Sequence, residues 1–348
     1  MEQVDLLILG SGPAGCAAAI TGAALGLKVL VVDRNPASRK AGDALPPQAA
    51  PILQKLGVVP DPAWATPTAG LQFQWGSETA GTTSFAGLHR RFGLALNRPV
   101  FEEHLRQKAL EAGACILTSG PEGLQETPQG WTLKLQEGTE IHARCVLDAT
   151  GRQAWVARQL GIKRHSLDAQ VALYREVDST DGPPWIQVTA VEEGWWYISQ
   201  LPHARSEMFF TLPESPAYLE KIHQGGWKVA PASVTFLSQV AGERWLAVGD
   251  AAFTFDPIAS QGISQALASG YYAACAARDL LQGRKEAILA YTLTLLKATE
   301  GFFREWAGIY QAEQRFGGSI YWQQRHNLRS VQLPWWQQAE LFTWVQAR

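Results

Sequence analysis

The chain has 348 residues, 46% of them hydrophobic, and a formal net charge of −2. This excludes a mainly disordered chain, suggests about two domains, and argues against a nucleic-acid partner, which usually selects a basic surface. The four cysteines are far apart and form no CxxC pair, so we expect no metal site and a reducing, cytoplasmic compartment.

The first 33 residues have the pattern of a βαβ unit. An apolar run of strand length precedes Gly10, Gly12 and Gly15, an alanine-rich stretch follows them, and a second apolar run ends at Asp33. This is the spacing of a dinucleotide-binding turn, in which glycines let the backbone approach a pyrophosphate. The helix N-terminus attracts the phosphates, and the acidic residue can bind the adenosine ribose. We therefore predict one permanently bound dinucleotide.

Two uncharged runs, residues 6–27 and 257–277, are long enough to test as membrane spans. The first contains five glycines and Pro13, and the second contains repeated Ser, Gln and Gly. Neither is expected to cross a membrane, and the chain carries no targeting signal that we can identify.

The next part of the chain alternates short helical and extended patterns. We predict helices over residues 45–56 and 98–112, a loop over 60–70, short strands within 71–96, and strands over 115–118, 131–136 and 141–147. The last strand ends in Asp148-Ala149-Thr150-Gly151.

The second half begins with extended patterns and ends with helical ones. Strands are predicted over residues 171–174, 185–191, 195–200, 207–212, 234–239 and 245–248, and helices over 260–281 and 287–308. The aromatic tail from Leu333 to Val345 is either a docking surface or, as we favour, a segment packed on the core.

Residues 245–262 contain an apolar run that ends in Gly249-Asp250, then Asp256-Pro257, then a helix that begins near Gly262. This resembles the "GD…DP…G" signature of FAD-dependent monooxygenases and halogenases. The resemblance implies that Asp250 binds the ribityl chain of FAD and that Pro257 lies beside the isoalloxazine. The helix would then direct its N-terminal amides at the N1/O2 edge of the flavin, where reduced flavin is negative.

Other segments are similar to the same superfamily. The superfamily has similar residues at the Ala149-Thr150-Gly151 turn and at Arg98, which starts a helix. Residues 42–47 also resemble its "GESLPP" segment, with Asp43 in place of Glu. Residues 75–77 and 304–326 look closest to the LodB-like flavoproteins, which modify Trp or Tyr side chains of partner proteins. The resemblance implies FAD contacts from Gly10, Gly12, Pro13, Ala14, Gly15, Asp33, Arg34, Gly42, Asp43, Arg98, Ala149, Gly151, Gly249, Asp250, Pro257, Gly262 and Ile263.

The expected fold is α/β: a glutathione-reductase-type FAD-binding Rossmann domain, an inserted antiparallel β-sheet substrate domain, and a helical C-terminus. The FAD-binding domain would be discontinuous, over residues 1–70, 98–164 and 242–315. The substrate domain would comprise residues 71–97 and 165–241, and a helical segment would follow over 316–348.

Halogenation is disfavoured by two departures from the halogenase pattern. Flavin halogenases carry G-W-x-W-x-I-P and a lysine that captures hypohalous acid. Here Tyr197 replaces the second Trp, and Ser199-Gln200 replaces Ile-Pro. The lysines between residues 41 and 144 are Lys55 and Lys108, on predicted helices, and Lys134, on a late strand, so none is where the halogenase lysine belongs.

By resemblance, the chain is an NAD(P)H-dependent monooxygenase that hydroxylates a phenol or indole, free or as a Trp or Tyr side chain of a peptide or protein. The flavin C4a-hydroperoxide would be the oxidant, so the cofactor carries the chemistry. Candidate catalytic residues on the β-rich part are Trp195, Tyr197, His89, Arg91 and Gln200. Alternatives are a reductase of the geranylgeranyl-reductase type, a halogenase, and a non-catalytic FAD-binding partner protein. NAD(P)H is the expected transient electron donor, and a partner flavin reductase is the other source of electrons.

Overall fold

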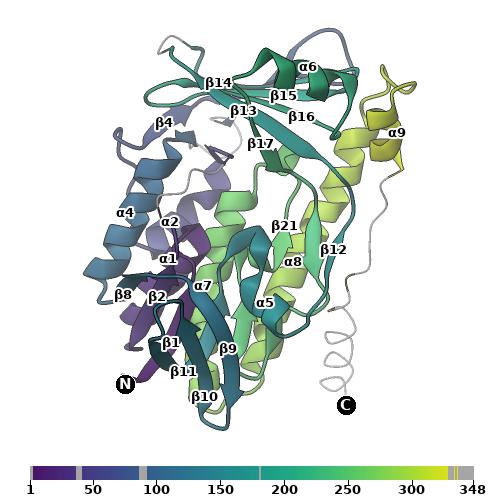
Figure 1. Cartoon of the computed structure of the whole chain (residues 1–348). Helices are drawn as coiled ribbons and strands as arrows, with labels where there is room; N and C mark the ends of the chain where they lie inside the picture. Colours follow the sequence, from purple (N-terminus) through teal and green to yellow (C-terminus); the bar gives the residue numbers. More distant parts are fainter. Residues whose placement is uncertain are drawn as a thin grey trace, which may run out of the picture.

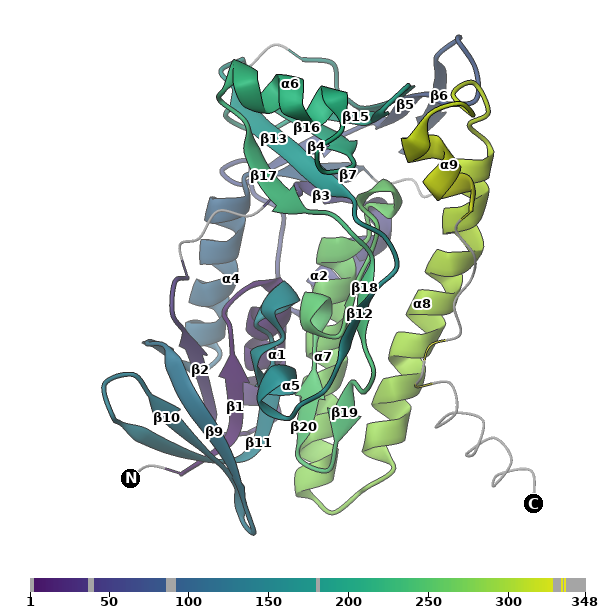
Figure 2. The ribbon, with the colours of Figure 1, turned by 45° about the vertical axis from the view of Figure 1, so that its right-hand side comes forward.

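The computed structural model describes residues 3–36, 41–85, 92–179, 182–327, 333 and 335. Figures 1 and 2 show two large sheets, one at the lower end of the molecule and one across the top, with helices between them. The mixed α/β architecture and the helical C-terminal part agree with the predicted fold class.

The lower sheet has eight strands and begins with the predicted βαβ unit. Five strands are parallel: β1 (Gln3–Leu9), β2 (Val29–Asp33), β8 (Cys115–Thr118), β11 (Glu140–Asp148) and β20 (Trp245–Ala247). Antiparallel strands complete it: β9 (Pro121–Thr127), β10 (Gly130–Leu135) and β19 (Ala241–Gly242). Strand β1 lies between β11 and β2 and has an almost continuous apolar sequence, as expected for a strand covered on both faces.

Two small-residue helices cover one face of this sheet in close contact. They are α1 (Pro13–Ala24) and α7 (Gly262–Leu281). A Cβ atom at Gly270 of α7 would lie 2.1 Å from the carbonyl oxygen of Ala14, so only glycine permits this approach. Further helices are α2 (Ala50–Lys55), α4 (Arg98–Glu111), α5 (Trp155–Gln159), α8 (Ala287–Gln311) and α9 (Ile320–His326). Helix α8 runs from the lower end to the top sheet, where α9 follows it (Figure 2).

The top sheet has seven strands and is mainly antiparallel, in the order β17-β13-β16-β15-β14-β5-β6. Its strands are β5 (Gly70–Gln74), β6 (Gly81–Ser84), β13 (Val171–Val177), β14 (Trp185–Val191), β15 (Gly194–Gln200), β16 (Arg205–Thr211) and β17 (Lys228–Pro231). Helix α6 (Pro216–Gln224) lies on its outer side (Figure 1). Strands β5 and β14 pair in parallel although about 115 residues separate them, which is why we propose residues 71–97 and 165–241 as one substrate domain.

Two three-stranded sheets connect these parts. One contains β3 (Ala44–Leu45), β4 (Ala65–Thr68) and β7 (Gly93–Leu96), and the other β12 (Arg164–Ser166), β18 (Thr235–Leu237) and β21 (Phe253–Thr254). Short 3-10 turns occur at η1 (Pro47–Ala49), η2 (Gly151–Gln153), η3 (Gly249–Ala251) and η4 (Pro257–Ala259).

Two local predictions were wrong, and some elements were not predicted. The predicted loop over residues 60–70 contains β4, which is extended because it pairs with β7, a partner that the local sequence does not reveal. Leu45 belongs to β3 and not to the predicted helix over 45–56. Strand β9 and helix α6 were not predicted.

Within the described part of the chain, no helix is both long and apolar enough to cross a membrane. Trp335 is 1% exposed and donates a hydrogen bond from its Nε1 to the carbonyl oxygen of Leu237, 2.8 Å away. This part of the aromatic tail is packed on the core, as we favoured, and most of the tail lies outside the described residues.

Candidate FAD site

A cavity of about 540 Å³ lies where the N-termini of α1 and α7 meet the inner face of the top sheet. Its volume is within the usual range for cofactor sites. Most of the predicted FAD-binding residues line it: Gly12, Pro13, Ala14, Gly42, Asp43, Arg98, Ala149, Gly151, Asp250, Pro257, Gly262 and Ile263. The topology therefore brings together motifs from both ends of the chain.

The glycine turn after β1 is shaped by close backbone contacts. Gly10 has a φ of +105°, and a Cβ at this position would lie 2.4 Å from the carbonyl oxygen of Ala149. A Cβ at Gly15 would lie 1.9 Å from the carbonyl oxygen of Gly10. Gly10 and Gly15 are therefore required by the turn itself, and neither lines the cavity.

Both helices that point into the cavity have N-termini suited to an anion. Helix α1 begins after Gly12 and α7 after Gln261; neither N-cap side chain makes a capping hydrogen bond, and neither first turn contains an acidic residue. Such ends present N–H groups with no intrahelical partner and a partial positive charge. One end suits the phosphates of FAD and the other the electron-rich edge of its flavin ring.

Asp33 has a partner within the protein. Its Oδ2 accepts hydrogen bonds from the backbone N–H of Ser11 at 2.6 Å and from the Ser11 hydroxyl at 2.7 Å. The carboxylate thus supports the glycine turn from the end of β2, outside the cavity lining, and Arg34 beside it is exposed. A ribose contact by either residue remains a prediction.

The segment that contains Gly249 and Asp250 is held by an arginine that the sequence analysis missed. Arg164 in β12 donates hydrogen bonds to the carbonyl oxygens of Asp250 at 3.1 Å and Ala251 at 2.6 Å. Gly249, with a φ of +56°, lies outside the cavity lining and packs against Ala14. Nothing in the local sequence pairs Arg164 with this turn, because 86 residues separate the partners.

Arg98 connects the start of α4 to the cavity wall. Its guanidinium donates a hydrogen bond to the carbonyl oxygen of Gly42 at 2.6 Å and forms an ion pair with Glu102 one helical turn later. Arg98 therefore fixes the backbone of the Gly42-Asp43 segment and adds positive charge to the wall.

Tyr197 and Asp43 form a buried pair on the wall. The Tyr197 hydroxyl donates a hydrogen bond to Oδ1 of Asp43 at 2.8 Å, and the two residues are 5% and 4% exposed. Oδ2 of Asp43 is buried and has no partner with hydrogen-bond geometry among the described residues. Burial raises the pKa of Asp43, although the hydroxyls of Ser206, Tyr197 and Ser199 favour its charged form. The pair joins the top sheet to the Gly42-Asp43 segment.

The other candidate catalytic residues occupy different places. Trp195 is fully buried, stacks on Phe210 at a centroid distance of 4.0 Å, and does not line the cavity. Gln200 donates hydrogen bonds to the carbonyl oxygens of Ser179, Leu201 and Ala204, at the end of β15. His89 and Arg91 lie outside the described residues. Tyr197 is therefore the one candidate of this group that the described structure places at the cavity.

A second cavity, of about 580 Å³, adjoins the first, and Ala44 and Ser260 line both. Its wall combines apolar side chains, among them Leu71, Phe85 and Ile186, with a polar rim of glutamines and serines. Lys55 is the lysine on its described wall, and its ammonium lies 4.8 Å from the ring centroid of Tyr271. The described wall of the first cavity has arginines but no lysine.

The raised pKa of Asp43 predicts a specific dependence of stability on pH. A carboxyl with a folded pKa above its unfolded value contributes stability that is fully present below the unfolded pKa. That contribution is lost as the pH rises through the folded pKa. The Tm of FAD-free Asp43→Asn should therefore fall less than that of the wild type as the pH rises from about 4 to 8.

Asp5 provides a control of opposite sign in the same thermal measurements. Partial burial raises its pKa, but hydrogen bonds from the Lys28 backbone and from Arg144 outweigh this and leave the pKa lowered. The wild type loses this contribution to stability as the pH falls, and Asp5→Asn lacks it at every pH. The Tm of Asp5→Asn should therefore fall less than that of the wild type as the pH falls. If the Tm of the wild type and that of Asp43→Asn change equally with pH, the prediction for Asp43 is contradicted.

The residues of the first cavity fit FAD. A glycine-rich turn, two helix ends with free N–H groups and the Asp250–Pro257 segment converge on one space. When FAD is bound there it supplies redox chemistry, and the protein supplies position and electrostatics.

Comparison with known proteins agrees with this assignment. Residues 5–183, which are 179 of the 348, match the family described as lycopene cyclase protein. The putative FAD-dependent oxidoreductase LodB of Marinomonas mediterranea is 25% identical over 95% of this chain and 99% of its own length.

Two solved structures share the fold. The myxobacterial chondrochloren halogenase CndH has a TM-score of 0.83 at 21% identity, covering 100% of this chain and 90% of its own. The peptidyl tryptophan dihydroxylase QhpG has a TM-score of 0.72 at 22% identity, covering 95% and 80%. These likenesses support the Rossmann-type fold.

Proposed function

This chain is an FAD-dependent oxidoreductase that belongs to the lycopene cyclase protein family, and we propose that it hydroxylates an aromatic phenol or indole. The observation that carries the proposal is the Tyr197–Asp43 pair at the wall of the FAD cavity. A carboxyl oxygen without a partner in a buried wall can accept a hydrogen bond from a substrate O–H or N–H. A phenol and an indole each present such a donor next to an electron-rich ring.

The wall around this pair suits an aromatic ring. Tyr174, Met208 and Phe210 of the top sheet and Phe255 line the same cavity. These side chains would exclude water from the reacting ring and contact its faces and edges. Asp43 would orient the ring through its O–H or N–H group, and Tyr197 would hold Asp43 in place.

The absence of a lysine from the described wall favours hydroxylation over halogenation. Lys55 lies on the wall of the second cavity, against the rings of Tyr271 and Tyr272, on helix α2. The peptidyl tryptophan dihydroxylase QhpG, which shares the fold, supports a Trp side chain of a peptide as one substrate form. We propose NAD(P)H, or a partner flavin reductase, as the source of electrons.

The test is oxygen incorporation from ¹⁸O₂ into phenols, indoles and Trp- or Tyr-containing peptides, measured by mass spectrometry. The protein is loaded with FAD and reduced with NADH, NADPH or a flavin reductase, with and without bromide. A product that carries one ¹⁸O atom supports the proposal. A brominated product, or reoxidation of the reduced flavin with no ¹⁸O in any of these substrates, would overturn it.

Tyr197→Phe and Asp43→Asn are the variants that test the pair. Each should lower the rate of product formation by about tenfold or more, because an orienting hydrogen bond is lost or weakened. Tyr291→Phe is the matched control, because it removes a buried tyrosine hydroxyl that donates to the carbonyl oxygen of Ala247, 2.6 Å away, outside the described wall of the cavity. If Tyr197→Phe and Asp43→Asn form product at the same rate as the control variant, the role of the pair is contradicted.

A further inference from the structure

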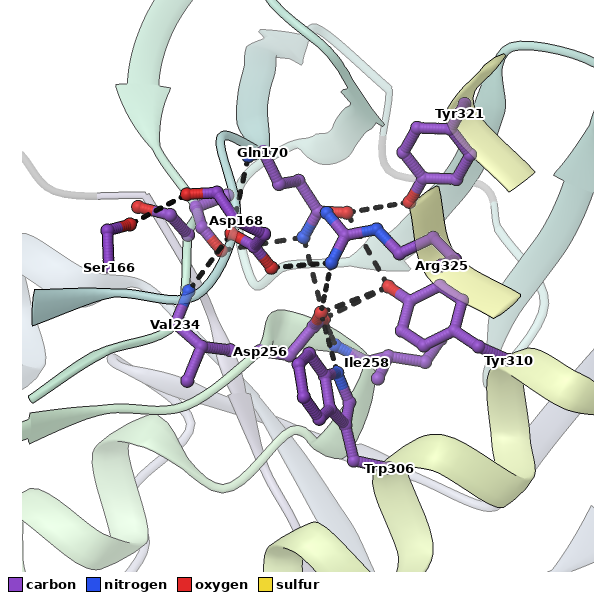
Figure 3. A network of polar contacts seen from close by, with 12 residues as sticks. Ser166, Asp168, Gln170, Val234, Asp256, Ile258, Trp306, Tyr310, Tyr321 and Arg325 are labelled. Carbon is purple, nitrogen blue, oxygen red and sulfur yellow. Dashed lines mark hydrogen bonds and ion pairs between the residues drawn. The ribbon is translucent and has the colours of Figure 1, made fainter. Parts of the chain in front are cut away.

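A buried polar network lies behind the Asp256-Pro257 segment, on the side of the C-terminal helices (Figure 3). It joins Asp256 to Asp168 and Gln170, which lie just before β13, and to side chains of α8 and α9. Nothing in the proposed reaction uses it. Its members come from four segments, and Asp256 is the member that also lines the FAD cavity.

Asp256 is the centre of the network. Its Oδ2 accepts hydrogen bonds from Nε1 of Trp306 at 2.9 Å and from the hydroxyl of Tyr310 at 3.1 Å, both in α8. Its Oδ1 accepts one from the backbone N–H of Ile258 at 3.0 Å. The same carboxylate thus caps the turn that begins at Pro257 and receives donors from α8.

Arg325 in α9 supplies the positive charge. It is 1% exposed, and its Nη1 lies 2.5 Å from Oδ2 of Asp168 and 3.4 Å from Oδ2 of Asp256. Its guanidinium lies against the rings of Tyr310 and Tyr321, at 5.1 and 5.2 Å from their centroids. One arginine therefore faces two buried carboxylates.

This arrangement is sensitive to the loss of its cation. Two carboxylates without a partner in a buried space repel each other and are poorly solvated. Both carboxylates have further donors, and that of Asp168 is the backbone N–H of Val234 at 3.2 Å. The two differ in position, because Asp256 lies at the start of a segment that lines the cavity and in which Ser260 has a φ of +51°. Non-glycine residues keep that conformation only where the surroundings enforce it.

We propose that Arg325 is a positioning residue for the FAD site. It holds Asp256, and through Asp256 it fixes the segment from Pro257 to Gly262, which lines the cavity beside the N-terminus of α7. The proposal does not depend on which substrate the enzyme oxidises. Arg325 does not line the cavity, but through Asp256 it affects FAD affinity and the environment of the flavin.

The test compares Arg325→Met and Arg325→Lys by FAD titration, by the visible absorption and circular dichroism of bound flavin, and by the Tm of the FAD-free protein. Arg325→Met should bind FAD at least about tenfold more weakly and shift the flavin spectrum. Arg325→Lys keeps the charge on a shorter side chain that cannot place its nitrogen where Nη1 lies between the two carboxylates, so the loss should be about threefold.

Arg315→Met is the matched control. Arg315 also pairs with a fully buried carboxylate, that of Glu313, but it lies outside the described walls of both cavities. This variant should lower the Tm and leave FAD affinity unchanged. If Arg325→Met lowers the Tm yet keeps its FAD affinity and spectrum within twofold of the wild type, the role of Arg325 is only structural and the proposal fails.

If Arg325→Met does not fold, Arg325→Lys and Tyr310→Phe test whether the network affects the FAD site. Tyr310→Phe removes one donor to Asp256 without creating a cavity or an unpaired charge. FAD affinity and flavin spectrum unchanged in both of these variants would overturn the proposal. Weaker FAD binding and a shifted spectrum in both would support it.

Discussion

Replacing Gly15 with alanine is expected to weaken FAD binding by about a hundredfold. The new Cβ would lie 1.9 Å from the carbonyl oxygen of Gly10 and 3.2 Å from the Cβ of Ala149. The closest atom belongs to the backbone, so no side-chain rotation relieves the contact. The turn between β1 and α1 must shift, and with it the N–H groups that face the cavity.

The measurement is FAD titration followed by flavin fluorescence, with circular dichroism to verify the fold. Gly308→Ala is the control, because Gly308 is within α8 and a Cβ there meets nothing within 4 Å. This control should bind FAD normally and gain about 0.5–1 kcal/mol in the free energy of unfolding, since alanine favours a helix. Normal FAD affinity in Gly15→Ala would contradict our assignment of the phosphate site to this turn.

Replacing Trp195 with alanine is expected to lower the free energy of unfolding by about 3–5 kcal/mol, as is typical for a fully buried tryptophan. Trp195 is 0% exposed, stacks on Phe210, and meets the edge of Trp75 at a centroid distance of 6.3 Å. The lost side chain would leave a cavity beneath the top sheet. Phe210 lines the FAD cavity, so its position would change as well.

Two further variants separate packing from catalysis at this strand. Trp195→Phe keeps an aromatic ring and removes a buried Nε1 that has no hydrogen-bond partner among the described residues, so turnover should stay within about threefold. Trp196→Ala, on the opposite face of β15 and half-buried, should cost about 1–2 kcal/mol. Denaturant unfolding gives the free energies, and product formation gives the rates. A stable Trp195→Phe protein without turnover would indicate a catalytic role.

The α/β class and most elements could be predicted from the sequence because their patterns are local. The run before Gly10, the glycine spacing and Asp33 define the βαβ unit within 33 consecutive residues. The "GD…DP…G" segment is also contiguous, and the structure places both patterns around one cavity. Strand β4 was missed because its partner β7 lies about 25 residues away and pairing, not composition, makes it extended.

The roles of the candidate catalytic residues could not be distinguished from the sequence alone. Trp195 and Tyr197 point to the same face of β15, and no sequence pattern distinguishes them. In the structure Tyr197 reaches Asp43 at the cavity wall, whereas Trp195 packs between Phe210 and Trp75. The difference depends on Asp43 and Trp75, which are both more than 100 residues away from β15.

By itself, the sequence predicted a dinucleotide site at a glycine turn, since backbone conformation and helix-end charge follow from residue type and spacing. Only the tertiary structure decided which side chains support that site. Arg164 reaches the Asp250 turn across 86 residues, and Arg325 reaches Asp256 across 69. A buried charge selects its partner by distance in three dimensions, because the low dielectric of the interior makes an unpaired charge costly wherever it lies along the chain.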